Sequence, residues 1–222
     1  MKKQFLKFSV LSLFAMILSA GAHAQGSDRV WSIGPEMGVN FSKWGNDADD
    51  SDYKAGLVAG GFVTYSIRDT YGFTAKVLFS QKGAAYTMAA PGEDVDVKTQ
   101  LNYIEIPITA RLFFNREGTV RPNVFFGPSF GFLTGAKVKV EDGDYENYED
   151  IDDNIDSYKD VYNTFDLGLA AGLGLNIRVG EEMYFIIDAR YTYGLTDIAK
   201  GNSSVNNQAV AVSAGLSFGI GN

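Results

Sequence analysis

The sequence predicts an all-β fold, an eight-stranded antiparallel up-and-down transmembrane β-barrel. Apolar and polar residues alternate with period two in eight segments, which is typical of strands with one apolar face. The connections between these segments alternate between short and long. After the first 24 residues, Gly, Asp, Lys or Arg interrupts every apolar run, so no later stretch reaches the roughly 20 apolar residues of a membrane-spanning helix.

Residues 1–24 have the three parts of a removable export signal. Lys2, Lys3 and Lys7 make the start basic, residues 8–18 form an apolar centre, and Ala22-His23-Ala24 is a small-residue cleavage site. The centre is too short to span a bilayer as a helix, which disfavours the alternative of an N-terminal anchor. We therefore expect residues 25–222 to form the mature protein, as a single barrel domain.

The mature chain would be acidic and would contain neither histidine nor cysteine. The only histidine, His23, lies in the signal, and loss of the three signal lysines leaves 16 basic against 27 acidic residues, a net charge of −11. This composition excludes imidazole and thiolate metal sites, cysteine nucleophiles, Ser-His-Asp triads and disulfide scaffolds. Phosphate repulsion also makes nucleic acid a poor partner. We expect no enzyme and no cofactor.

The eight alternating segments follow one another without a visible domain boundary. Apolar residues have odd numbers in the first, second, third, sixth and seventh segments, and even numbers in the others. The sixth is the clearest, because every odd residue from Phe165 to Val179 is apolar and Gly, Ala or polar residues lie between them. The segments are residues 31–42, 56–67, 72–80, 104–114, 123–132, 164–179, 185–195 and 210–220.

The connections predict that all tight turns lie at one end of the barrel and all large loops at the other. The short connections are residues 68–70, 115–121 and 180–182. The long ones are residues 43–54, 82–98, 141–163 and 197–207. This arrangement is typical of an outer-membrane barrel whose chain ends face the periplasm and whose large loops lie outside the cell.

The two faces of the segments indicate which side is inside. The polar faces are rich in Gly, Ala, Ser and Thr, which suit a lumen that side chains just fill. The apolar faces carry bulky Leu, Ile, Val and Phe, too many for a narrow eight-stranded barrel to enclose. We therefore expect the bulky residues to face lipid. The alternative is a soluble, lipocalin-like carrier with an apolar interior.

Charged residues on the polar faces predict an ion-pair network that plugs the lumen. They comprise equal numbers of acids and bases, and buried ions are tolerated when they are paired. A charge-selective pore lining is the alternative, although eight strands leave little free lumen. The residues are Glu36, Lys76, Glu105, Arg111, Asp166, Arg178, Asp188 and Arg190.

Aromatic residues near the segment ends are expected to form girdles at the membrane interfaces, or else ordinary sheet packing. They are Trp31, Tyr65, Phe113, Phe114, Tyr191 and Tyr193. Outside the segments, the connection 141–163 is strongly acidic, with Lys159 as its one base. Its acids are Glu141, Asp142, Asp144, Glu146, Glu149, Asp150, Asp152, Asp153, Asp156 and Asp160.

A solvated acidic loop is the expected state of residues 141–163. Clustered carboxylates also suit Ca²⁺, but Ser157 stands where an EF-hand loop beginning at Asp152 needs glycine. Four tyrosines interleave with the acids, either as a recognition surface or as packing on the barrel rim. They are Tyr145, Tyr148, Tyr158 and Tyr162.

Three stretches carry a resemblance to a known family: residues 34–42 (GPEMGVNFS), 101–107 (LNYIEIP) and 122–128 (PNVFFGP). With them, the mature chain resembles small outer-membrane β-barrels of the porin-family or PorT-like type, similar in architecture to OmpA/OmpX-like barrels of Gram-negative bacteria. The resemblance implies the fold and an outer-membrane location, and it is weak for activity because such barrels serve many roles.

The expected function is therefore non-enzymatic: a structural or surface-interaction protein that acts through acidic outer loops. Its expected partners are outer-membrane lipid and an envelope protein or surface ligand that the loops bind. A narrow porin for passive diffusion of small solutes is the first alternative, and the lipocalin-like carrier is the second.

Overall fold

The computed structural model describes residues 29–48, 51–67, 70–90, 93–114, 118–142, 145–149, 157–201 and 204–220. The predicted signal, residues 1–24, lies outside these ranges. No helix within them is long and apolar enough to cross a membrane. The elements are β1 (Arg29–Asn46), β2 (Lys54–Ile67), β3 (Tyr71–Ala90), β4 (Glu93–Phe113), β5 (Val120–Asp142), β6 (Tyr145–Glu149), α2 (Ser157–Val161), β7 (Phe165–Arg178), β8 (Met183–Gly194) and β9 (Val205–Ile220).

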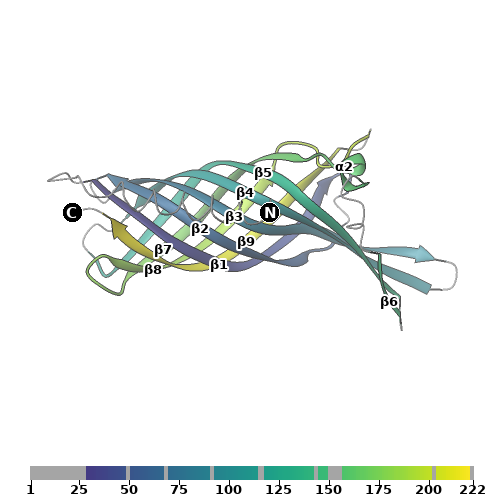
Figure 1. Ribbon diagram of the computed structural model, residues 1–222, viewed down its shortest axis with the longest axis horizontal. Coiled ribbons are helices and arrows are strands. Elements are labelled where there is room, and N and C mark those ends of the chain that lie inside the picture. Colours follow the sequence, from purple (N-terminus) through teal and green to yellow (C-terminus); the bar gives the residue numbers. More distant parts are fainter. Residues whose placement is uncertain are drawn as a thin grey trace, which may run out of the picture.

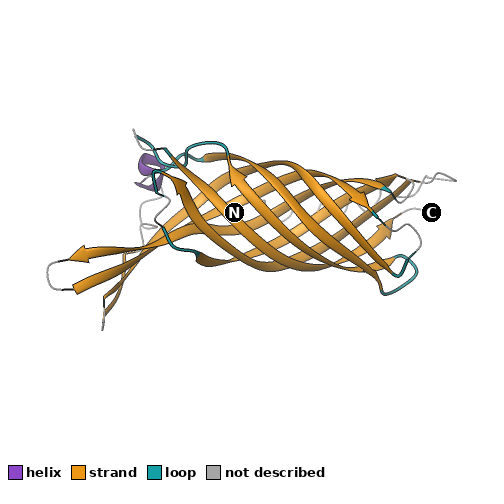
Figure 2. Cartoon of the chain, turned by 180° about the vertical axis from the view of Figure 1, so that it is seen from behind, coloured by secondary structure: helices purple, strands orange, loops and turns teal. Residues whose placement is uncertain are grey.

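Eight of these strands close into a ring, as Figures 1 and 2 show from opposite sides. Their order is β4-β3-β2-β1-β9-β8-β7-β5, every neighbouring pair is antiparallel, and pairing of β4 with β5 closes the ring. The short strand β6 lies outside the ring and pairs only with the end of β5. The predicted eight-stranded up-and-down barrel is confirmed.

The bulky apolar residues point away from the barrel axis. Met37 and Leu173 are each 64% exposed and Phe126 is 57% exposed, whereas the intervening residues of the same strands are mostly buried. An exposed apolar band is the surface that a membrane barrel presents to lipid. It also excludes the lipocalin-like carrier, which needs its apolar face inside.

The predicted tight turns and the large connections lie at opposite ends of the barrel. At one end, Trp31 of β1 pairs with Ile220 of β9, and the turns between β2 and β3, β4 and β5, and β7 and β8 lie nearby. We call this the short-turn end. At the other end, Asn46 pairs with Val205, and we call this the long-loop end.

The prediction of open loops at the long-loop end was wrong in two places. Residues 82–98 are mostly strand, because β3 continues to Ala90 and β4 begins at Glu93. Likewise, β5 continues to Asp142, and β6 and α2 follow within the connection 141–163. The extended strands pair with one another, which satisfies backbone groups that a loop would leave to water.

These extensions form a four-stranded sheet that projects beyond the barrel wall, at the right of Figure 1. We call it the projecting sheet: residues 84–90 of β3, 93–99 of β4, 138–142 of β5, and β6. Its order is β3-β4-β5-β6. A register shift lies at its base, where Thr134 is an extra residue of β5 beside Asn102 and Tyr103 of β4. The Thr134 hydroxyl donates to the Asn102 carbonyl at 3.0 Å.

Candidate functional site in the barrel lumen

The structure buries all but one of the residues predicted to line the lumen. Glu36, Lys76, Glu105, Arg111, Asp166, Asp188 and Arg190 are buried. Arg178 is exposed at the end of β7, where its Nε donates to the Tyr184 hydroxyl at 3.2 Å. The prediction that Arg178 belongs to the lumen cluster was therefore wrong: it shares the polar face of β7 but lies at the rim, where its charge keeps its hydration.

The buried charges form two separate layers along the barrel axis. The first, which we call the Asp188 layer, lies toward the short-turn end. Lys76 Nζ is 2.6 Å from a Glu36 carboxylate oxygen and 2.9 Å from Asp188. Arg111 binds both oxygens of Asp188, at 2.7 and 3.0 Å. Such a two-pronged contact is the strongest geometry between arginine and a carboxylate.

Small residues on the neighbouring strands make room for this layer. Asp188 on β8 pairs across the sheet with Gly174 of β7 and Ser213 of β9. A Cβ at Gly174 would lie 2.5 Å from Asp188 Oδ1 and 2.9 Å from the Arg111 guanidinium. The Arg111 guanidinium also donates to Asn123 Oδ1 at 2.9 Å and stacks 4.6 Å from the Phe125 ring centre. The absence of a side chain at Gly174 therefore leaves the space that Asp188 and Arg111 occupy.

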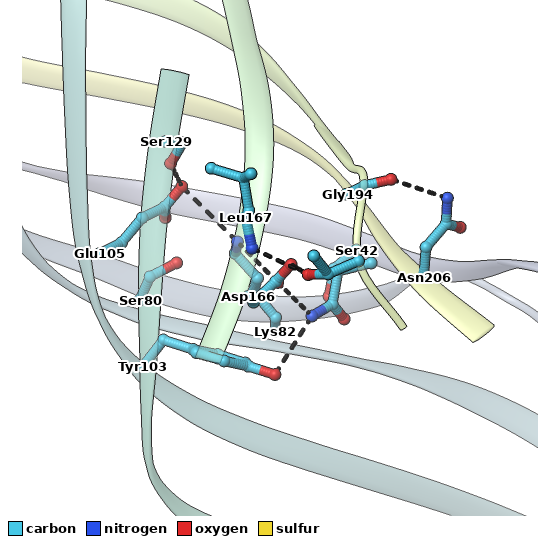
Figure 3. Close-up of polar contacts among 12 residues, drawn as sticks. Ser42, Ser80, Lys82, Tyr103, Glu105, Ser129, Asp166, Leu167, Gly194 and Asn206 are labelled. Atoms are coloured by element: carbon cyan, nitrogen blue, oxygen red, sulfur yellow. Dashed lines mark hydrogen bonds and ion pairs between the residues drawn. The ribbon is translucent and has the colours of Figure 1, made fainter. Parts of the chain in front are cut away.

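The second layer, which we call the Glu105 layer, lies toward the long-loop end, and Figure 3 draws Lys82, Glu105, Ser129 and Asp166 of it. Glu105 accepts from Ser129 at 2.8 Å and from Arg190 at 3.3 Å, and it lies 3.5 Å from Lys82 Nζ. Lys82 also reaches Asp166 at 4.0 Å. Leu78, which lies between Lys76 and Lys82 along β3, is fully buried and clusters with Val58 and Ala211.

Lys82 and Tyr103 are members of the Glu105 layer that the sequence analysis missed. Lys82 was placed in a loop, yet it continues the even-numbered inward face of residues 72–80, so extending the alternation by two residues would have found it. Its ammonium lies 5.4 Å from the centre of the Tyr103 ring. Asn207 links the ring to the charges, because its amide donates to the Tyr103 hydroxyl at 3.2 Å and to Asp166 at 2.8 Å.

A cluster of apolar residues, which we call the apolar cap, lies beyond the Glu105 layer. It is a cluster of buried side chains from β4, β5, β9 and the connection before β9, with partly buried neighbours. The buried members are Leu101, Tyr103, Leu133, Ala136, Ile198 and Val205, and the neighbours are Trp44, Ala48, Tyr162 and Ala199. The cap lies at the long-loop end, beside α2.

Backbone hydrogen bonds tie α2 and the residues before β9 into this cap. Asn163 N–H donates to the Ile198 carbonyl at 2.8 Å, and Lys200 N–H donates to the Val161 carbonyl at 2.8 Å. The carbonyl of Ser204, the residue before Val205 of the cap, accepts from the N–H of Asp47 at 3.0 Å. Because Asp47 directly follows β1, this bond connects the end of β1 to the residues of the cap. Burial raises the pKa of the Tyr162 phenol above its usual value. These bonds hold α2 and the residues before β9 beside the apolar cap.

At the short-turn end, one of the predicted girdle residues does not lie on the outer surface. Phe113 was expected in an interfacial girdle, but its side chain is buried inside the barrel, 4.6 Å from the Arg121 guanidinium. The parity of β4 explains this, because odd residues of this strand face inward. Trp31 and Tyr65 are on the outer surface, with ring centres 4.7 Å apart.

The predicted acidic surface falls almost entirely outside what the structure describes. Asp144, Asp150, Asp152, Asp153 and Asp156 lie outside the described residues, and so does the first part of the candidate Ca²⁺ loop, residues 152–156. Asp142 and Glu146 belong to β5 and β6, where only the backbone is described. Within the described residues, no three acidic side chains are grouped to hold a metal ion.

Comparison with models of protein families gives a match over most of the chain. A model of the outer membrane protein beta-barrel domain matches residues 23–200. No curated protein matches the chain.

Several solved structures are similar at low identity. Neisserial surface protein A is 14% identical, with 85% of this chain and 96% of that chain covered and a TM-score of 0.44. OprG from Pseudomonas aeruginosa is 12% identical, with coverages of 88% and 98% and a TM-score of 0.48. Ail of Yersinia pestis, in complex with the heparin analogue sucrose octasulfate, is 16% identical, with coverages of 85% and 99% and a TM-score of 0.41. At these TM-scores the three similarities carry no argument about function.

Proposed function

This chain belongs to the outer membrane protein beta-barrel domain family, and from its geometry we propose that it is a non-enzymatic barrel that binds a partner protein through the projecting sheet. It resides in the outer membrane, where its apolar outer face contacts lipid. The observation that carries the proposal is the sheet itself, which extends four strands beyond the wall of the barrel.

The edges of the projecting sheet favour binding of an extended partner segment. Past Ser80, β3 has no ladder with β2 in the described residues, and only the isolated bridge between Asp52 and Ala85 remains. On the far side, β6 pairs with β5 alone among the described strands. Backbone N–H and C=O groups along such edges can pair with another strand, which is a general mode of peptide recognition.

The interior of the barrel supports a closed lumen. Two layers of ion pairs cross it, and the apolar cap lies over them at the long-loop end. A hydrated ion would have to break these contacts in sequence to pass. This arrangement favours the plugged barrel over the narrow porin that the sequence left open as an alternative.

Site-specific photo-cross-linking in whole cells tests the proposal. A photoreactive residue is introduced in place of Thr87, which is exposed on β3 in the projecting sheet, and in a second strain in place of Thr119, which is exposed at the short-turn end. We expect a defined cross-linked protein band from position 87 that position 119 does not give. Equal patterns, or none from position 87, would contradict a partner at the sheet.

A further inference from the structure

A cavity of about 350 Å³ enters the barrel at the short-turn end. At its inner end it reaches Lys76, Arg111 and Asp188, so the Asp188 layer forms its floor. This volume lies near the lower end of the range of small-molecule binding sites, which suits a ligand with a single ring.

The charges at the floor of the cavity balance one another. Lys76 Nζ contacts Glu36 and Asp188, and Arg111 holds both oxygens of Asp188. Two cations therefore face two carboxylates. A charged ligand would lose its hydration at this floor without gaining a counter-ion, so the floor favours a neutral ligand.

The two floor cations nevertheless keep donors that no described residue accepts. An ammonium carries three N–H groups, and the contacts of Lys76 with Glu36 and Asp188 use two of them. Arg111 Nη2 donates to Asp188 alone, and Arg111 Nε has no hydrogen-bond partner within the described residues, although Arg111 is only 5% exposed. Buried donors without acceptors favour a ligand that supplies neutral oxygen atoms.

Serine hydroxyls from three strands also line the cavity. They belong to Ser32 of β1, Ser66 of β2 and Ser217 of β9, and they form no hydrogen bond in the part of the chain that the structure describes. Tyr184 adds a fourth hydroxyl, which accepts from Arg178 Nε and so keeps its own O–H as a donor. These groups can donate to, and accept from, several hydroxyls of one ligand.

Aromatic rings supply the apolar part of the wall. Phe62, Phe113 and Tyr184 line the cavity together with Ile186. The guanidinium of Arg121 is already occupied, because it stacks 4.6 Å from the centre of the Phe113 ring and 5.7 Å from that of Tyr184. Apolar walls with a few polar groups that fix orientation are typical of cavities that bind small organic molecules.

We propose that this cavity binds one neutral sugar ring, either free or at the end of a glycan chain. Oxygen atoms of the sugar would accept from Lys76 and Arg111, its other hydroxyls would bond to the three serines, and its C–H groups would pack against Phe62. A purely apolar ligand would leave the donors and the serine hydroxyls without partners, and a charged one would find its counter-ions already paired. The cavity and the projecting sheet lie at opposite ends of the barrel, so failure of either role leaves the other intact.

The test uses the ¹⁵N-labelled full barrel refolded in dodecylphosphocholine micelles, because detergents with sugar headgroups would compete for the cavity. The probes are the methyl β-glycosides of glucose, galactose and mannose, since galactose and mannose each differ from glucose in the direction of one hydroxyl. We expect at least one of them to give saturable shifts of backbone signals of β1, β2 and β9 near the three serines, at about millimolar sugar.

Two analogues of the sugar that binds test the chemistry of the cavity. The methyl glycuronide carries a carboxylate in place of the CH₂OH group, and tetrahydropyran-2-methanol keeps the ring but lacks the ring hydroxyls. Each should bind about tenfold more weakly or worse, the first because its charge gains no counter-ion and the second because it leaves buried donors unpaired. A trisaccharide that ends in the same sugar identifies the source: tighter binding than the methyl glycoside supports a glycan end, and equal binding supports a free sugar.

Variants separate the cavity from general effects on the barrel. Ser217→Ala should weaken binding about threefold to tenfold, because one hydrogen bond is lost, and the matched Ser213→Ala, on the same inward face of β9 but outside the lining, should not. Ser32→Phe fills the cavity without changing any charge and should abolish the shifts. If Ser32→Phe fails to fold, the comparison of Ser217→Ala with Ser213→Ala decides. No saturable shift from any of the three glycosides, equal binding of the glycuronide, or equal effects of the two alanine variants would overturn the proposal.

Discussion

At the scale of single residues, Gly174 is a position whose surroundings leave no room for a side chain. Asp188 and Arg111 occupy the space that a Cβ would need. We predict that Gly174→Ala displaces their contact and lowers the free energy of unfolding by about 1–3 kcal/mol. Urea unfolding in micelles measures this. Gly135→Ala is the control, because its Cβ would meet only the Asn102 amide, at 3.8 Å. Equal losses of unfolding free energy in the two variants would contradict the prediction that Asp188 and Arg111 leave no room for a side chain at position 174.

The two lumen arginines should differ in their importance. Arg111 holds both oxygens of Asp188, whereas Arg190 makes one 3.3 Å contact with Glu105. We predict that Arg111→Ser costs about 3–5 kcal/mol of unfolding free energy, because a buried carboxylate loses its main partner. Arg190→Ser should cost less, since Lys82 and Ser129 still contact Glu105. Arg178→Ser at the rim serves as control. Unfolding curves that coincide for all three variants would rule out an energetic role for the layers.

Alternation alone could assign most lumen residues but not those at strand ends. Asp188 and Glu105 lie in mid-strand, where period two leaves one choice of face. Lys82 and Arg178 share the inward parity of their strands near the ends of the alternating segments, and there the same face can be buried by a neighbouring element or open to water. Parity therefore assigns the face, whereas the burial of Lys82 beneath the cap and the exposure of Arg178 at the rim depend on tertiary packing.

At the scale of elements, the projecting sheet escaped detection for a related reason. Alternation marks strands with lipid on one side and lumen on the other, and beyond the membrane that contrast is lost. The sequence pattern of residues 86–90 therefore predicts a loop. In the structure these residues of β3 pair with β4, and Ala90 with Glu93 is the last pair. The bulge at Thr134 also changes the inward parity of β5, so that Ala136 follows Leu133 into the cap.

The tip of the projecting hairpin should be dispensable for folding. We predict that replacing residues 88–95 with Asn-Gly leaves the free energy of unfolding within about 0.5 kcal/mol, because Thr87 and Asp96 already face each other and this dipeptide favours a two-residue hairpin turn. The shift in gel mobility between heated and unheated samples gives a first check, and urea unfolding gives the value. Failure of this variant to fold would mean that the hairpin tip nucleates the barrel.

The cap should open when one of its buried side chains is charged. Ile198 is 1% exposed among the apolar residues of the cap. We predict that Ile198→Asp expels this segment and speeds hydrogen exchange at the amides of Asn163 and Lys200, since both bonds hold the cap together. The matched variant is Val161→Asp on α2, where the native side chain is already 55% exposed. Unchanged exchange in Ile198→Asp would show that the cap does not depend on apolar packing.

At the scale of the whole molecule, the proposed plugged lumen predicts the absence of an open pore. Purified protein in a planar bilayer should give no steady single-channel steps at ordinary voltages, because a hydrated ion would have to break the contacts of the two charged layers and of the cap to pass. Ile198→Asp should remain silent as well, since the Glu105 layer stays beneath the opened cap. Steady steps from the unmodified protein would favour the narrow porin.

The pairing of β1 with β9 joins residues from opposite ends of the sequence, from Trp31 with Ile220 to Asn46 with Val205. Until β1 and β9 pair, the curved sheet has two unpaired edges. Hydrocarbon cannot form hydrogen bonds with the backbone N–H and C=O groups of these edges. An open barrel with two unpaired edges is thus unfavourable in the membrane. Pairing of the last strand with the first is therefore needed before the barrel can rest in hydrocarbon with all its strand edges satisfied.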